Sequence, residues 1–313
     1  MSEDFLWVEK YRPKTIKETI LPSDLKKTFQ QFVDQKQVPN LLLSGTAGLG
    51  KTTVARAMLE EIGCDYFVVN GSLNGNIDTL RHDIQTFAAT MSFEGGRKYV
   101  ILDEADYLNA NSTQPALRNF MEEFSSNCGF ILTCNYKNRI IPALHSRCSV
   151  VDFAINGSDS IKLAGQFFKR LCSILDQENV KYDKGVVAEV INKFFPDFRR
   201  VLNELQRYAA TGGIDSGILS TFNNATFESL IELINDKNFT EVRKWVAENA
   251  QGDIDSIFET FYNNCSKYFE SKSIPELVLI LSKYQYQAAF VSNQEINLSA
   301  CMVDIMANCL VKK

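Results

Sequence analysis

A glycine-rich stretch, residues 45–52, carries the clearest chemical signal in the sequence. It matches the phosphate-binding pattern G-x-x-x-x-G-K-S/T through Gly45, Thr46, Ala47, Gly48, Leu49, Gly50, Lys51 and Thr52. Glycines let backbone N–H groups approach nucleotide phosphates, Lys51 reaches the β and γ phosphates, and Thr52 offers a hydroxyl to Mg²⁺. An apolar run precedes the stretch and a helical pattern from Thr53 follows it, the context that separates this pattern from an ordinary glycine turn.

Two acids follow a second apolar run, residues 99–102. A phosphate-loop ATPase needs acids at such a strand tip, where Asp103 would hold the Mg²⁺ shell and Glu104 would polarise the attacking water. The alternative is a solvated strand end. Residues 103–106 also spell Asp-Glu-Ala-Asp, as in RNA helicases, but the other helicase motifs are not visible in the sequence.

Three further polar residues stand where they can complete a nucleotide site. Asn135 follows another strand pattern and either contacts the γ-phosphate or is an ordinary turn residue. Arg147 precedes the last strand pattern and either caps a helix dipole or enters a neighbour's site as an arginine finger. Arg199 opens a later helix, where the dipole disfavours a cation, and either meets the γ-phosphate or lies on the surface.

The elements that must position these residues alternate between strand and helix in the first half of the chain. The β-type runs are residues 41–43, 66–69, 99–102, 130–133 and 150–153. Because helical stretches separate them, they predict a parallel α/β sheet. Apolar stripes predict helices packed on the sheet, one through Ile77, Leu80, Ile84, Phe87 and Met91 and another through Leu117, Met121 and Phe124. We expect Asp24 to cap an earlier helix.

The sequence changes character after Phe153. A polar stretch is followed by helical patterns over residues 161–175, 185–195 and 197–209, the last with Asp197 as its N-cap. Residues 211–213 break the chain again, and everything beyond them has helical character. The predicted organisation is an α/β nucleotide-binding domain over 1–154, a helical domain over 155–213 and a second helical domain over 214–313.

Composition narrows the function classes. The net charge is −5, which argues against a basic protein that wraps nucleic acid and confines any DNA contact to a local patch. The eight cysteines form no C-x-x-C pair, which disfavours zinc and fits a reducing cytoplasm, and Cys134 and Cys148 are interpreted as core thiols. No stretch has the apolar length of a membrane span, so we expect a soluble cytoplasmic protein.

The motifs together resemble those of sliding-clamp-loader ATPases of the AAA+ class, which are related to replication factor C small subunits. Beside the phosphate loop, they are Lys10-Tyr11-Arg12-Pro13, Leu102-Asp103-Glu104-Ala105-Asp106, Gln114-x-Ala116-Leu117-Arg118, Met121-Glu122, Thr133-Cys134-Asn135, Ser146-Arg147-Cys148 and Asp197-Phe198-Arg199-Arg200. Details such as Ile20-Leu21-Pro22 are most similar to the T-even-type bacteriophage members. Thr46-Ala47 stands where the family usually has Pro-Pro, and Leu49 where it has Thr.

The resemblance implies an AAA+ P-loop domain with a five-stranded parallel sheet, a helical lid and an all-α collar that oligomerises. It implies ATP and Mg²⁺ as cofactors, with Glu104 as the catalytic base and Lys51, Thr52 and Asp103 holding the phosphates and the metal. Asn135 matches sensor one, Arg199 matches sensor two, and Arg147 matches the finger that acts in trans. Val8, Tyr11, Arg12 and Pro13 would lie against the adenine.

The resemblance also implies partners. The chain would form a ring or spiral with other copies of itself and a smaller non-ATPase subunit, acting on the sliding clamp and primer-template DNA in the cytoplasm of an infected bacterium. Helices beginning near Asn76 and Ser112 would face the DNA, with Arg81, Ser112 and Thr113 as candidate contacts. Asn76 stands where a basic residue is expected, and Arg81 is alternatively a solvated surface residue. Rival functions are a non-hydrolysing scaffold subunit and another AAA+ remodelling ATPase, such as a helicase loader or branch-migration motor.

Overall fold

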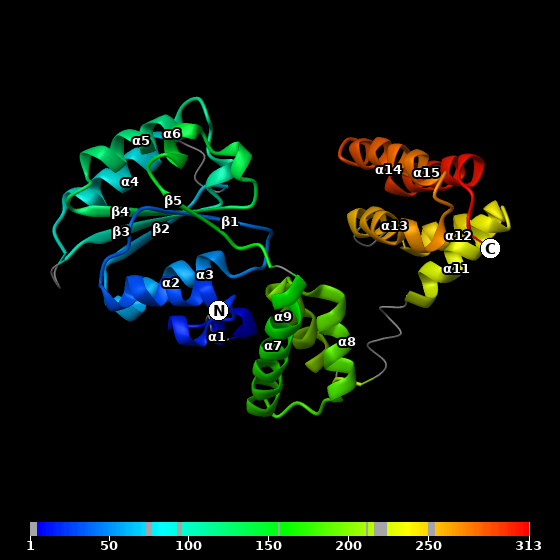
Figure 1. Ribbon diagram of the computed structural model, residues 1–313, viewed down its shortest axis with the longest axis horizontal. Helices are drawn as coiled ribbons and strands as arrows, with labels where there is room; N and C mark the ends of the chain where they lie inside the picture. The colour runs from blue at the N-terminus through cyan, green and yellow to red at the C-terminus, as the bar shows by residue number, and fades with distance from the viewer. Residues whose placement is uncertain are drawn as a thin grey trace. The chain divides into compact units, whose positions relative to one another are not determined.

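The computed structural model describes residues 5–72, 77–92, 96–155, 157–210, 212–215, 224–249 and 254–312. The chain divides into two compact units, residues 1–219 and residues 220–313 (Figure 1). The division lies a few residues beyond the second boundary predicted from the sequence, at 213/214. Each unit is described by itself.

The first unit contains a five-stranded parallel sheet, and all five predicted runs are strands. The strands are β1 Leu41–Ser44, β2 Tyr66–Asn70, β3 Lys98–Asp103, β4 Cys128–Cys134 and β5 Ser149–Asp152. Their order across the sheet is β2-β3-β4-β1-β5. In this register Ser44 lies beside Cys134, so the phosphate loop after β1 emerges next to Asn135 after β4. Parallel pairing thereby gathers the predicted site at the carboxyl edge of the sheet.

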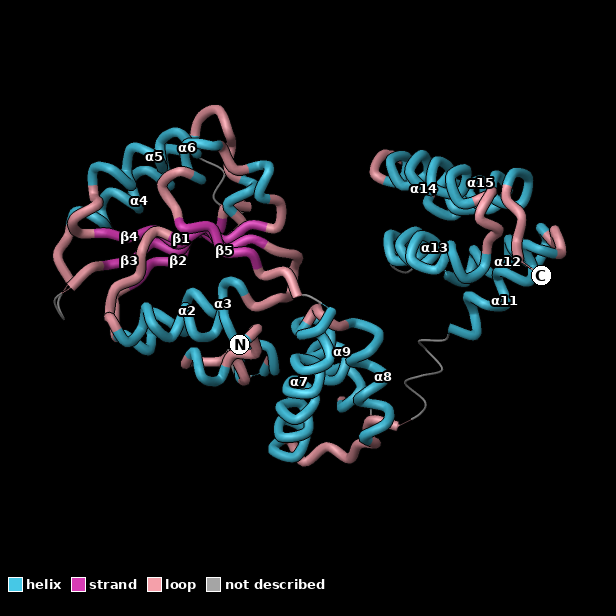
Figure 2. The backbone as a smooth tube through the Cα atoms, in the orientation of Figure 1, coloured by secondary structure: helices cyan, strands magenta, loops and turns pink. Residues whose placement is uncertain are grey.

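Helices cover both faces of the sheet, with α4, α5 and α6 on one side and α2 and α3 on the other (Figures 1 and 2). The helices are α2 Ser23–Asp34, α3 Lys51–Ile62, α4 Ile77–Ala89, α5 Thr113–Glu123 and α6 Pro142–His145. Successive strand residues point to opposite faces, so β4 contributes Phe130 and Leu132 to one core cluster and Ile131 to the other. These two apolar layers hold the strands and hence the site at their ends.

Two details of the helix predictions are wrong. Met91 is 85% exposed because α4 ends at Ala89, which takes Met91 off the helical stripe that buries Ile84. The side chains of Ile77 and Leu80 lie outside the described residues. Helix α2 begins at Ser23, so Asp24 lies inside the first turn and makes no cap hydrogen bond.

A three-helix lid follows the sheet in the same unit, formed by α7 Gly157–Gln177, α8 Lys184–Phe194 and α9 Phe198–Ala209. Asp197 caps α9 as predicted, because its Oδ1 accepts from the Arg200 N–H at 2.9 Å. The N-terminal helix α1 Trp7–Lys10 packs against this lid. Buried Trp7 donates its backbone N–H to Gln206 Oε1 at 2.9 Å, which ties the start of the described chain to α9.

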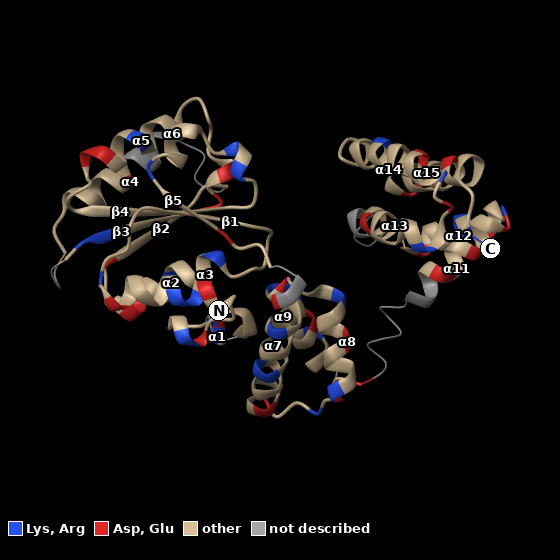
Figure 3. Cartoon of the chain, viewed as in Figure 1, with Lys and Arg blue, Asp and Glu red and all other residues tan. Residues whose placement is uncertain are grey.

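The second unit is built from helices around its own apolar core. They are α11 Asn224–Asn235, α12 Phe239–Asn249, α13 Ile254–Tyr268, α14 Ile274–Ala288 and α15 Gln294–Asn308. Phe261, Leu277 and Leu298 are fully buried in this core. Lys and Arg are interspersed with Asp and Glu in both units (Figure 3). No helix among the described residues has the length and apolarity needed to cross a membrane.

Candidate functional site

The phosphate loop connects β1 to α3, and Gly48 and Gly50 within it lie in the left-handed region of backbone space. Gly48 has φ +78° and Gly50 has φ +82°, conformations that favour glycine because it lacks a Cβ. A Cβ on Gly48 would also lie 1.9 Å from Asp197 Oδ1 of the lid. The loop therefore needs glycine at position 48 both for its own turn and for the close approach of the lid.

Lys51 begins α3 and is buried, with its ammonium group at the centre of several polar contacts. Nζ donates to the backbone oxygens of Gly45 at 2.7 Å and Thr46 at 2.8 Å, and to Asn135 Oδ1 at 2.9 Å. Burial lowers the pKa of Lys51 from its ordinary value, while nearby Asp103 opposes this shift. The side chain thus joins the phosphate loop to the residue after β4.

Asp103 lies at the end of β3 and is fixed by two hydroxyl groups. Its Oδ1 accepts from Thr52 Oγ1 at 2.6 Å and from Thr133 Oγ1 at 2.6 Å. Thr133 also accepts the backbone N–H of Glu104 at 3.1 Å. Glu104 has φ +54°, a left-handed conformation that costs a non-glycine residue about 1–2 kcal/mol and turns the chain sharply after the strand.

Asp106 contributes to the site, although the sequence predicted no role for it. It is buried, and its Oδ2 accepts the backbone N–H groups of Asn135 at 3.2 Å and Tyr136 at 3.1 Å. These bonds fix the chain where it leaves β4 and hence orient Asn135 toward Lys51. The fourth letter of the Asp-Glu-Ala-Asp tetrad was the only signal of this position, and spacing alone does not reveal its partners.

With the exception of Arg147, the polar residues predicted for the nucleotide site line one cavity. It is lined by residues of the phosphate loop and by Asp103, Glu104, Thr133, Asn135 and, from the first turn of α9, Arg199. The lining from the loop comprises Ala47, Gly48, Gly50, Lys51, Thr52 and Thr53, joined by Val8 from α1. Segments far apart in the sequence therefore place carboxylates, cations, hydroxyls and backbone donors around a single polar space.

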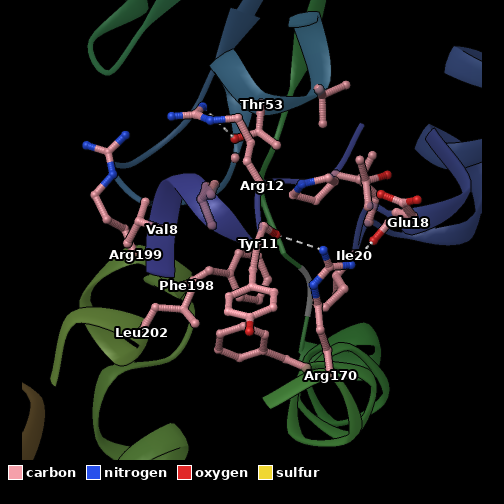
Figure 4. Close-up of a pocket in the computed structure, with 18 residues that line it drawn as sticks. Val8, Tyr11, Arg12, Glu18, Ile20, Thr53, Arg170, Phe198, Arg199 and Leu202 are labelled. Atoms are coloured by element: carbon pink, nitrogen blue, oxygen red, sulfur yellow. Dashed lines mark hydrogen bonds between the residues drawn. The ribbon is translucent and has the colours of Figure 1, made fainter. Parts of the chain in front are cut away.

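An apolar pocket adjoins this cavity and has the predicted N-terminal segment as one wall (Figure 4). Its lining includes Val8, Tyr11, Arg12, Pro13, Leu49, Thr53, Phe167, Phe198 and Leu202. The rings of Phe167 and Phe198 meet edge to face with centroids 4.7 Å apart. Arg12 Nη1 donates to Thr53 Oγ1 at 3.3 Å, which ties the segment to α3. Aromatic and aliphatic walls of this kind suit a planar base.

Arg170 of the lid is a second residue that sequence reasoning missed. From α7 its guanidinium donates to the backbone oxygens of Tyr11 at 2.9 Å and Glu18 at 2.7 Å, on the wall of the apolar pocket (Figure 4). Burial lowers the pKa of Arg170 from its ordinary value. Tyr11 also donates its hydroxyl to Glu178 at 2.5 Å. The lid therefore fixes the position of the pocket wall.

Arg147 lies at the opposite edge of the sheet from these groups. It precedes β5, in which Ser149 lies beside Leu41 at the start of β1 and Asp152 lies beside Ser44 at its end. Arg147 is not among the residues that line the polar cavity. Its Nε donates to Glu122 Oε1 at 2.9 Å and its Nη1 to the Ala143 backbone oxygen at 2.9 Å.

The candidate DNA contacts differ in their surroundings. Ser112 is exposed at the N-cap of α5, with its backbone N–H bonded to Asn109 Oδ1 at 3.1 Å. Thr113 is 2% exposed, which leaves its side chain little surface to offer. Arg81 belongs to α4, but its side chain lies outside the described part, as does Asn76 altogether.

The donor set at the strand tip fits a magnesium ion. The Thr52 hydroxyl and the Asp103 carboxylate present hard oxygen ligands within 2.6 Å of each other. In the part of the chain that is described, no three His, Cys, Asp or Glu residues gather as a metal cluster. Mg²⁺ commonly binds through one or two protein oxygens plus substrate phosphates, so a single carboxylate beside a phosphate loop is sufficient.

The cysteines are free in the described structure. Cys134 is buried as predicted, and burial raises its pKa to about 11. Cys148 is only partly buried, although it packs against a core cluster and its pKa is raised to about 12. Burial therefore favours the protonated form of both thiols.

Two protein-family models and several known proteins are similar to this chain. The model of the ATPase family associated with various cellular activities, AAA, matches residues 41–158. The model of the AAA+ ATPase lid domain of the sliding-clamp-loader large subunit matches residues 159–220. The chain is 34% identical to the sliding-clamp-loader large subunit of Escherichia phage RB69, covering 97% of this chain and 96% of the relative.

Two more relatives and a solved structure agree. Identity is 33% to the sliding-clamp-loader large subunit of Enterobacteria phage T4, over 95% and 94% of the two chains. It is also 33% to the replication factor C small subunit of Archaeoglobus fulgidus, over 94% and 95%. The RuvB Holliday junction branch migration motor of Thermotoga maritima superposes with a TM-score of 0.51 at 16% identity, covering 71% of this chain and 78% of that one. This last likeness shows a shared fold.

Proposed function

The chain belongs to the family of sliding-clamp-loader large subunits, and we propose that it hydrolyses ATP with the residues of the polar cavity while it loads a sliding clamp onto DNA. The observation that supports this assignment is the convergence of Lys51, Asp103 and Glu104 on one cavity beneath the lid. Groups that bind phosphate, hold a metal and activate water are all within that space.

ATP binds across the two adjoining pockets in this proposal. The phosphate loop donates its backbone N–H groups to the phosphates, and Lys51 places a buried positive charge beside them. The adenine occupies the apolar pocket between the N-terminal segment and Phe198 of the lid. Thr52 and Asp103 would hold Mg²⁺, which neutralises phosphate charge when bound.

Hydrolysis requires a base and groups that sense the γ-phosphate. Glu104 accepts a proton from the attacking water, a role that the sharp turn after β3 supports by directing its side chain into the cavity. Asn135 accepts a hydrogen bond from Lys51, which also bonds the phosphate loop, and it orients the attacking water or the γ-phosphate. Arg199 reaches the same cavity from the lid. A γ-phosphate bound there would therefore contact both the α/β part of the unit and the lid.

Arg147 acts on a neighbouring copy in this scheme. It precedes β5, so it stands one strand length, about 13 Å, from the carboxyl edge where its own phosphate loop begins. A guanidinium at that edge meets a nucleotide only if a second subunit presents its own site. An arginine finger of this kind neutralises charge that develops on the transferred phosphoryl group.

The assembly contains further components in this proposal. Other copies form a ring or spiral with a smaller non-ATPase subunit, and the assembly binds the clamp and primer-template DNA. Exposed Ser112 at the start of α5 and Arg81 of α4 are proposed DNA contacts, repeated around the assembly. Thr113, the third candidate from the sequence, is 2% exposed, so we do not propose its side chain as a direct contact.

ATP turnover measured with primed DNA and clamp, added separately and together, tests the function. We expect the two together to stimulate turnover more than the sum of their separate effects. Stimulation by DNA with indifference to the clamp would indicate another AAA+ remodelling ATPase. An assembly that binds both and never hydrolyses ATP would indicate a scaffold subunit.

A further inference from the structure

Glu122 is the charged residue that meets the guanidinium of Arg147. Oε1 of Glu122 accepts from Nε at 2.9 Å and also from Nη2, while Nη1 donates to the Ala143 backbone oxygen and, at 3.4 Å, to Ser146 Oγ. These contacts restrain both ends of the guanidinium. They leave the second N–H of Nη2 for an acceptor outside this group.

The position of Glu122 is itself fixed by the core. It lies in the last turn of α5, directly after buried Met121, and the same helix buries Leu117 and Phe120 against the sheet. Arg147 lies in a short turn between α6 and β5, where its backbone N–H donates to the Leu144 oxygen at 3.1 Å. The carboxylate of Glu122, carried by a packed helix, can therefore fix the position of the Arg147 guanidinium.

The pair contributes orientation more than stability. The side chains of Arg147 and Glu122 are 32% and 57% exposed, and exposed ion pairs add little to the free energy of folding. An arginine side chain carries considerable rotamer freedom, which a finger must lose when it enters a neighbouring site. Restraint before assembly reduces that loss, as preorganisation does in other binding sites.

We propose that Glu122 is a positioning residue for Arg147 and holds its guanidinium ready to donate to the nucleotide phosphates of a neighbouring copy. This inference rests on the proposed trans role of Arg147. It gives a role to the Met121-Glu122 motif, which the nucleotide site of the same chain does not use. A rival possibility is that Glu122 competes with the phosphate for Arg147 and suppresses turnover.

The test compares Glu122→Gln with Glu123→Gln in the assembled loader with ATP, primed DNA and clamp. Glu123 is an exposed neighbour on the same helix with no hydrogen bond to Arg147, so it is a matched control for charge. We expect Glu122→Gln to lower the turnover rate at saturating ATP about threefold to tenfold, a modest loss because the pair is exposed and the finger remains. ATP affinity and thermal stability are expected to match those of Glu123→Gln.

A double variant separates positioning from a general structural effect. If Glu122 acts through Arg147, adding Glu122→Gln to Arg147→Ala causes no further loss of turnover. Additive losses, an increase in turnover or unchanged turnover in Glu122→Gln would each overturn the inference. If Arg147→Ala itself turns over normally, the trans finger of the proposed function fails first, and the two failures are distinguished.

Discussion

The two edges of the α/β sheet differ in how fully their functional side chains are held by other groups of the same chain. At the carboxyl edge, buried Lys51 and the Asp103 carboxylate have several hydrogen-bond partners, which come from the phosphate loop, from Thr133 of β4 and from Asn135 directly after β4. At the amino edge, Arg147 is partly exposed and is held by Glu122 and a helix carbonyl. The first edge presents a preorganised binding site, whereas the second presents a group whose proposed target belongs to another molecule. ATP binding and stimulated ATP hydrolysis should therefore respond differently to substitutions at the two edges.

The largest effect is expected at the amino edge. Arg147→Ala should bind ATP normally, because no group of the carboxyl edge is changed, yet lose about 10³ to 10⁵ in stimulated turnover if the finger assignment is correct. Equilibrium ATP binding and turnover with DNA and clamp measure the two quantities. Unchanged stimulated turnover would falsify the trans assignment.

Glu104→Gln changes the carboxyl edge without removing its phosphate ligands. The amide cannot accept the proton of the attacking water, so we expect turnover to fall about 10² to 10⁴-fold while ATP and clamp binding persist. Clamp release on DNA, followed by fluorescence, should stall. Normal release rates would remove Glu104 from the role of base.

A smaller effect is expected for Asp106→Asn. This variant tests whether the Asp106 carboxylate positions Asn135 after β4. The variant replaces a carboxylate that accepts two backbone N–H groups by a weaker amide acceptor. Because hydrogen bonds to charged groups contribute about 1.5–3 kcal/mol, turnover should fall about tenfold. Combination with Asn135→Ala should add little loss, and a fully additive loss would contradict the positioning role.

The smallest effect concerns the lid. Arg170→Gln removes the guanidinium that bonds two backbone oxygens on the wall of the apolar pocket. We expect ATP affinity to weaken about threefold to tenfold, as for the loss of one or two hydrogen bonds, with little change in the rate at saturation. Lys169→Gln, on the exposed side of the same helix, is the control. Equal affinities in the two variants would show that the lid does not shape the base pocket.

The strands and the loop were predictable because their signals are local. Five apolar runs and the glycine pattern each depend on neighbours in sequence, and the Asp197 cap depends on a residue at the start of a helix. Met91 and Asp24 were assigned wrongly because helix ends vary by one or two residues, and a single residue moves a side chain off its face.

Other features of the site depended on tertiary contacts. Asp106 acts through backbone groups of Asn135 and Tyr136, and Arg170 through the backbone of Tyr11 and Glu18, partners separated by long stretches of chain. Backbone acceptors and donors occur at almost every residue. The spacing of side-chain types in the sequence therefore cannot predict bonds between a side chain and a distant backbone group. The pairing of Arg147 with Glu122 likewise follows from the packing of α5 beside α6.

In the proposed mechanism, each hydrolysing site combines the carboxyl edge of one copy with Arg147 of another. A mixture of Arg147→Ala and Glu104→Gln subunits, assembled with clamp and primed DNA, tests it by single-turnover phosphate release. At some interfaces an intact site of the first variant meets the finger of the second, so the mixture should release phosphate faster than either variant alone. A mixture that is no faster than the average of the separate variants would contradict a site shared between copies.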